Sequence, residues 1–135
     1  MSGEKSIAKL LKGMSPSLNE GNYVFCTVKN SNILAGQEVL GSFREKEGLT
    51  VILEQSAALE LGLEFEYVAA WITLTVHSAL DAVGLTAAFS TALGNAGISC
   101  NVIAAYYHDH IFVGKDDAQK AIDVLEALAR SESGD

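Results

Sequence analysis

Residues 72–113 read ITLTVHSALDAVGLTAAFSTALGNAGISCNVIAAYYHDHIFV, and this run decides the fold. Apolar residues alternate with polar ones through 70–76, which predicts a half-buried β-strand. In 85–96 the apolar residues recur every three to four positions, which predicts an amphipathic helix. Two further β-rich segments, 98–106 and 110–113, predict a hairpin. The run therefore indicates a strand, a helix and a hairpin in succession.

The segments on either side of this run extend the same order. A last amphipathic helix is predicted to begin at Asp116 and to bury its Ala and Leu side chains. Gly62 follows a short helix as a C-terminal cap. The elements predicted before the run are a helix over 4–12, strands over 22–28, 42–47, 49–53 and 63–68, and a helix over 55–61. Ser15-Pro16-Ser17 is expected to end the first helix, because proline cannot donate a backbone hydrogen bond.

The fold class that these patterns predict is α+β, with two ferredoxin-like βαββαβ units. Each unit would form an antiparallel sheet with its helices packed on one face. We expect the first unit, with the N-terminal helix, in residues 1–68 and the second in 69–135. Tyr23, Phe25 and Trp71 are expected on the sheet faces opposite the helices, and exposed aromatic patches mark interfaces. This favours packing between sheets or a homodimer.

The composition excludes some partners. The chain has 135 residues with 9 basic and 17 acidic side chains, a net charge of −8, so its surface repels nucleic acid and anionic lipid. We therefore expect neither nucleic acid nor membrane as a partner. Cys26 and Cys100 lack the spacing of a metal site or a disulfide framework, which indicates two free thiols in a cytoplasmic protein. No cofactor is expected.

The connection from the predicted strand to the 85–96 helix is the first candidate site. Gly84 lets the backbone approach a neighbour closely, and the free amides of a helix start attract an anion. An α-amino acid would place its carboxylate on these amides and its ammonium on Asp81. Alternatively, Ser78 or Asp81 caps the helix, and Gly84 only permits a turn.

The same run resembles an ACT domain, the ligand-binding regulatory module of many enzymes of amino-acid metabolism. The GLTAAFSTALGNAGIS stretch is the most specific part, and the aspartokinase ACT repeats are the most similar. The whole chain resembles stand-alone bacterial proteins that fuse two ACT-like modules. By position, the resemblance implies an effector site, usually for an amino acid, formed by Ser78, Leu80, Asp81, Val83, Gly84, Leu85, Thr86 and Asn101.

Two further candidates come from the residues themselves. Arg44 lies in the charged stretch 43–47, and its planar guanidinium can hold a carboxylate with two hydrogen bonds. Alternating charges on a strand are also typical of a solvated face. His108 and His110 alternate onto one strand face, and His77 could join them around zinc or copper, or as a general acid or base. The alternative is a polar hairpin turn, and no metal is assigned.

The sequence favours a regulatory or sensor protein that binds a small molecule, with no catalytic activity of its own. It would act through a contact with a regulated protein partner. One alternative is a structural or interaction module without a ligand. Another is a metal-binding protein or enzyme that uses the three histidines.

Overall fold

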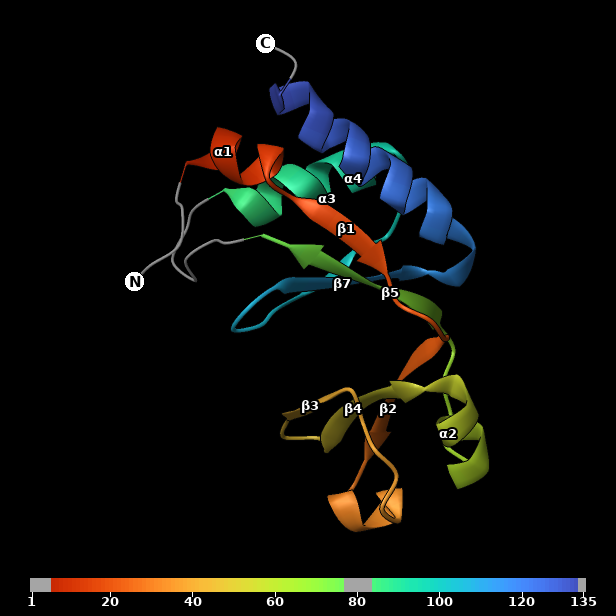
Figure 1. Cartoon of the computed structure of the whole chain (residues 1–135). Coiled ribbons are helices and arrows are strands. Elements are labelled where there is room, and N and C mark those ends of the chain that lie inside the picture. Colours follow the sequence, from red (N-terminus) through yellow and green to blue (C-terminus); the bar gives the residue numbers. More distant parts are fainter. Residues whose placement is uncertain (1–5, 77–83, 134–135) are drawn as a thin grey trace. The chain divides into compact units, whose positions relative to one another are not determined.

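The computed structural model describes residues 6–76 and 84–133. The chain divides into two compact units (Figure 1). Unit 1 consists of Met1–Asn19 with Ala70–Asp135, and unit 2 is Glu20–Ala69. Within the described residues no helix has the length and apolar character needed to cross a membrane.

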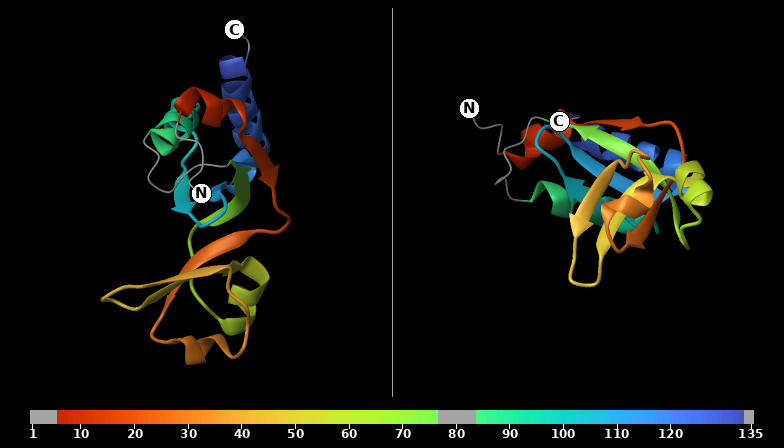
Figure 2. Two further views of the ribbon diagram at one scale, coloured as in Figure 1. Left: turned by 60° about the vertical axis from the view of Figure 1, so that its left-hand side comes forward. Right: turned by 90° about the horizontal axis from the view of Figure 1, so that it is seen from below.

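Unit 1 is a four-stranded antiparallel sheet covered by helices. Its strands run in the order β1 (Ser15–Leu18), β5 (Val68–Thr75), β7 (Asp109–Gly114) and β6 (Asn101–Ala104). Of β5, only the residues from Ala70 onward belong to unit 1. The helices are α1 (Ile7–Lys12), α3 (Leu85–Asn95) and α4 (Ala118–Ser133), with a 3-10 turn, η2 (Lys115–Asp117), before α4. Figures 1 and 2 show the three α-helices together on one side of this sheet.

The core of unit 1 follows the two periodicities of the sequence. Ile72 and Leu74 of β5 are fully buried, as are Phe89 and Leu93 one turn apart on α3. Leu125 of α4 completes the same cluster. The predicted amphipathic helix and alternating strand are therefore confirmed, because their apolar faces pack against each other.

Unit 2 is a smaller sheet with one α-helix. Its strands run in the order β3 (Gly41–Arg44), β4 (Leu49–Glu54) and β2 (Tyr23–Val28), and the first two residues of β5 pair with β2. A 3-10 turn, η1 (Ser31–Leu34), and α2 (Gln55–Leu61) complete it. Gly62 ends α2 in the left-handed conformation with φ 71°, as predicted. The buried residues of this core are Val24, Cys26, Val28, Leu34, Val51, Leu53 and Ala58.

The first helix ends before Ser15-Pro16-Ser17, as predicted, but the sequence analysis missed one strand and predicted another that does not form. Residues 15–18 form β1, because an edge strand tolerates Pro16 without its N–H. The predicted strand 63–68 does not form, and the ladder starts only at Val68. Leu63 and Phe65 alternate as in a strand, but they pack against the core of unit 2 without pairing.

The predicted fold class is confirmed: both units are antiparallel sheets with their helices on one face. The prediction of an exposed aromatic patch on the sheet is confirmed only in part. The side chain of Tyr23 is only 7% exposed, and that of Trp71 is half-buried. The division at residue 68 stays a prediction. The compact units differ from it in the first 19 residues, which pack with the C-terminal half as α1 and β1.

Candidate functional site

The entry to α3 is fixed by Gly84. This residue has φ 96°, a left-handed conformation that side chains rarely adopt. A Cβ at this position would lie 3.2 Å from Cδ1 of Ile7, so the Ile7 side chain on α1 would have to shift by a few tenths of an ångström to admit one. Leu85 follows and is buried, whereas Thr86 is exposed. The first turn of α3 therefore combines a tight backbone approach, an apolar anchor and an accessible hydroxyl.

The other predicted residues of this loop, Ser78, Leu80, Asp81 and Val83, lie outside the described residues. Asn101 is exposed at the start of β6, where its side-chain amide donates to the carbonyl oxygen of Phe112 over 3.3 Å. Gly84, Leu85, Thr86 and Asn101 all belong to unit 1.

Arg44 belongs to unit 2 and is exposed at the end of β3. It lines a hollow of about 640 Å³ together with Lys29 and Lys46. None of these three cations forms an ion pair with the described residues. Glu45, in the same hollow, accepts a hydrogen bond from the hydroxyl of Thr50. Glu47 also lines the hollow, so three cations lie there with two carboxylates, and Arg44 and Gly84 belong to different units.

A polar network connects three strands of unit 1. The indole Nε1 of Trp71 donates to Nδ1 of His110 over 3.0 Å, and Oγ1 of Thr73 lies 3.3 Å from the same nitrogen. Asn19, directly after β1, donates through its side-chain amide to Oγ1 of Thr73 over 2.9 Å. Because an indole N–H only donates, Nδ1 of His110 acts as an acceptor and carries no proton.

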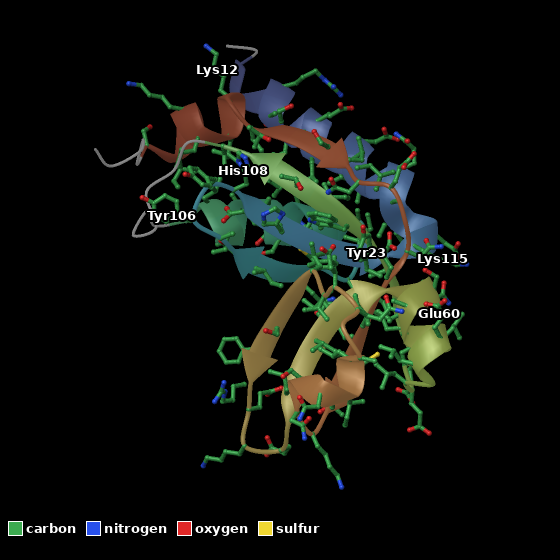
Figure 3. All side chains as sticks on the ribbon, turned by 60° about the horizontal axis from the view of Figure 1, so that its bottom comes forward. Lys12, Tyr23, Glu60, Tyr106, His108 and Lys115 are labelled. Atoms are coloured by element: carbon green, nitrogen blue, oxygen red, sulfur yellow. The ribbon has the colours of Figure 1, made fainter. Side chains whose placement is uncertain are left out.

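The rest of the hairpin places two more titratable groups beside His110. Nδ1 of His108 is buried and has no hydrogen-bond partner among the described residues. The ring centroids of His108 and His110 lie 6.4 Å apart, and Figure 3 shows His108 and the exposed Tyr106 of the same hairpin. Burial and His108 lower the pKa of His110, which Asp109 partly offsets. Burial raises the pKa of Asp109, and His110 opposes this rise.

The proposed metal cluster gains no support from these histidines. Among the described residues, no group of three or more His, Cys, Asp and Glu side chains is arranged to hold a metal ion. His77, the third predicted ligand, lies outside them.

Sequence reasoning missed the Trp71 network. The signal was present in part, because Trp71 and Thr73 lie two residues apart and therefore share a face of one strand. Asn19 could not be found in this way, because the sequence analysis predicted no strand at residues 15–18.

Comparison with known proteins agrees with this fold. The sequence matches the ACT domain family over residues 2–70 and again over residues 66–127. The chain belongs to the ACT domain family. It carries two ACT domains in tandem, and their matched ranges overlap at residues 66–70, around the start of β5. The comparison with curated protein sequences gave no significant match.

Solved structures share this tandem ACT fold. A protein of unknown function from Vibrio cholerae, described as a possible transport protein, is 54% identical, with a TM-score of 0.84 over 93% of this chain and 97% of that chain. The regulatory subunit of aspartate kinase from Thermus thermophilus has a TM-score of 0.65 at 10% identity, over 84% of this chain and 95% of that chain. Aspartate kinase from Clostridium acetobutylicum also gives 0.65, at 11% identity, over 86% of this chain and 34% of that chain.

Proposed function

We propose that this ACT protein binds an α-amino acid at the entry to α3 and acts as a regulatory or sensor module without catalytic activity of its own. Its membership of the ACT family supports binding of a small molecule, since ACT domains generally bind such ligands. The likeness to regulatory subunits of aspartate kinase supports the regulatory part of the proposal.

The observation that carries the proposal is the geometry at Gly84. The first amides of α3 have no carbonyl partner within the helix, and Gly84 provides no side chain to cap them. The partial positive charge of a helix N-terminus favours a carboxylate there. An α-amino acid would place its carboxylate on these amides, with Asp81 as the partner of its ammonium group.

The residues proposed to line this site are those of the loop, of α3 and of β6: Ser78, Leu80, Asp81, Val83, Gly84, Leu85, Thr86 and Asn101. Arg44 is proposed separately, as a carboxylate partner in the hollow of unit 2. Occupancy of the site would change the contact of this protein with a regulated partner protein in the cytoplasm.

Thermal unfolding with a panel of amino acids tests the proposal. At a free concentration of 100 times its dissociation constant, a ligand adds about 2.7 kcal/mol to the free energy of unfolding, so at least one amino acid should raise the Tm. No shift for any amino acid at millimolar concentration would contradict the proposal.

Variants then locate the site. Asp81→Ala should abolish the shift, whereas Glu126→Ala, which removes the same charge from the exposed face of α4, should leave it unchanged. Arg44→Gln distinguishes the entry to α3 from the hollow of unit 2. Loss of the Tm shift in this variant alone would indicate that the ligand binds in the hollow of unit 2.

A further inference from the structure

One carboxylate of unit 1 is buried without a positively charged partner. Asp109, the first residue of β7, is 9% exposed and is the only charged side chain that is buried among the described residues. Of these residues, only His110 has an electrostatic effect on it. His110 is neutral while it accepts the indole N–H of Trp71. When Asp109 is ionised, no described residue therefore neutralises its charge.

This position of Asp109 is unfavourable for the free protein. A buried carboxylate loses its hydration, and without an ion pair nothing replaces that loss. Burial accordingly raises the pKa of Asp109, and His110 only reduces the rise. Groups of this kind gather at functional sites, where a ligand can supply the missing partner. The oxygens of Asp109 are not sealed from solvent, unlike Nδ1 of the neighbouring His108, so a ligand can reach them.

The side chain of Asp109 lies on the helix side of the sheet. Successive residues of a strand alternate between the two faces, so Asp109 shares its face with Ile111 and Val113. Both of these residues are fully buried in the cluster that contains Leu85 and Phe89 of α3. The carboxylate therefore faces the layer of helices that includes α3.

Asp109 also lies at the end of the sheet where α3 begins. It pairs with Ala104 directly beside the turn that joins β6 to β7. Figures 1 and 2 show this turn and the first residues of α3 at the same end of unit 1. No hydrogen bond joins Asp109 to the first amides of α3, and Gly84 has no side chain to cap them. This end of the unit thus presents amides and a carboxylate that complement the two charges of an amino acid.

We propose that Asp109 is a binding residue of the site at the entry to α3, where it accepts a hydrogen bond from the ammonium group of the bound ligand. The inference rests on the proposed function and adds a second carboxylate to Asp81. An ammonium group has three N–H donors, so it can bond to both carboxylates. The ligand brings to Asp109 the positive charge that is missing there in the free protein.

The free protein provides the first test. At neutral pH, Asp109→Asn should have a higher Tm than the wild type, because it removes the unpaired buried charge and keeps the shape of the side chain. Asp123→Asn removes the same charge from the exposed face of α4 and is the matched control, with a Tm close to that of the wild type. A Tm of Asp109→Asn below that of the wild type would indicate that the carboxylate stabilises the fold, and would overturn the proposal.

Calorimetric titration with the amino acid that most raises the wild-type Tm provides the second test. Loss of a hydrogen bond to a charged group should weaken binding at least about tenfold in Asp109→Asn and leave Asp123→Asn unchanged. The matching α-hydroxy acid, which has no ammonium group, should lose far less affinity in Asp109→Asn. Equal affinity of the amino acid for the wild type and Asp109→Asn would overturn this inference alone. Failure of every amino acid to bind the wild type would overturn the proposed function as well.

Discussion

The indole N–H of Trp71 donates to Nδ1 of His110 across 3.0 Å, and this hydrogen bond requires a neutral imidazole. Burial and His108 also lower the pKa of His110 below its ordinary 6.5, with a smaller opposite effect of Asp109. Protonation at Nδ1 would break the bond to Trp71. The bond between β5 and β7 is therefore sensitive to pH.

His110 should make the protein less stable in mild acid. Because its pKa is lowered on folding, the unfolded chain takes up the proton at a higher pH than the folded chain. The stabilisation is complete above pH 6.5 and is lost as the pH falls below it. Urea unfolding of the wild type and of His110→Gln over this range measures the difference. Asp109, whose raised pKa acts in the opposite direction, loses the lowering effect of His110 in this variant, so both proteins are compared in an Asp109→Asn background that removes its contribution. A parallel pH dependence of the two would contradict the assignment.

Trp71 reports the same protonation directly. It is the only tryptophan of the chain, so its fluorescence should titrate below pH 6.5 as His110 gains a proton. In His108→Gln the midpoint should move upward, because His108 lowers the pKa of His110. In His110→Gln this titration should disappear. A titration that persists in His110→Gln would assign the signal to another group.

Phe89→Ala should cost about 3–5 kcal/mol of stability, because it leaves a cavity at a fully buried aromatic side chain. Phe43→Ala is the matched control: this side chain is 73% exposed, and its loss should change the stability by less than about 0.5 kcal/mol. Urea unfolding of both variants measures the contrast. Similar costs for the two would be inconsistent with the core of unit 1 described above.

Gly84→Ala should destabilise the protein by about 1–2 kcal/mol, the cost of a left-handed conformation for a residue with a Cβ. The contact with Ile7 adds to this cost. Gly94→Ala, in the same helix, should instead stabilise by about 0.5–1 kcal/mol, since nothing lies within 4 Å of the added Cβ and alanine favours helix. Opposite signs in thermal unfolding are the expected result, and a loss of stability in both variants would contradict it.

The two cysteines should react slowly with thiol reagents in the folded protein. Cys26 is buried, and burial raises the pKa of Cys100 to about 11. The reactive species is the thiolate, which is scarce for both residues near neutral pH. Titration with a chromogenic disulfide should find no rapidly reacting thiol in the native protein and two rapidly reacting thiols after denaturation. A fast native thiol would show that one of these environments is open to solvent.

The sequence by itself determined the main elements of unit 1. The spacing of Phe89 and Leu93 and the alternation of Ile72 and Leu74 predicted a helix and a strand with buried faces, and these faces form the core. Such periodic patterns are reliable because burying an apolar face stabilises the element that presents it. The glycines at the entry to α3 and after α2 were predicted for the same kind of local reason.

Only the tertiary structure decided which segments pair. Residues 15–18 became a strand because β5 offers them a partner, and 63–67 did not, because their apolar side chains pack without a ladder. The network of Asn19, Trp71 and His110 likewise joins residues far apart in the chain. Strand pairing and such hydrogen bonds depend on distant partners, so the local spacing of residues does not determine them.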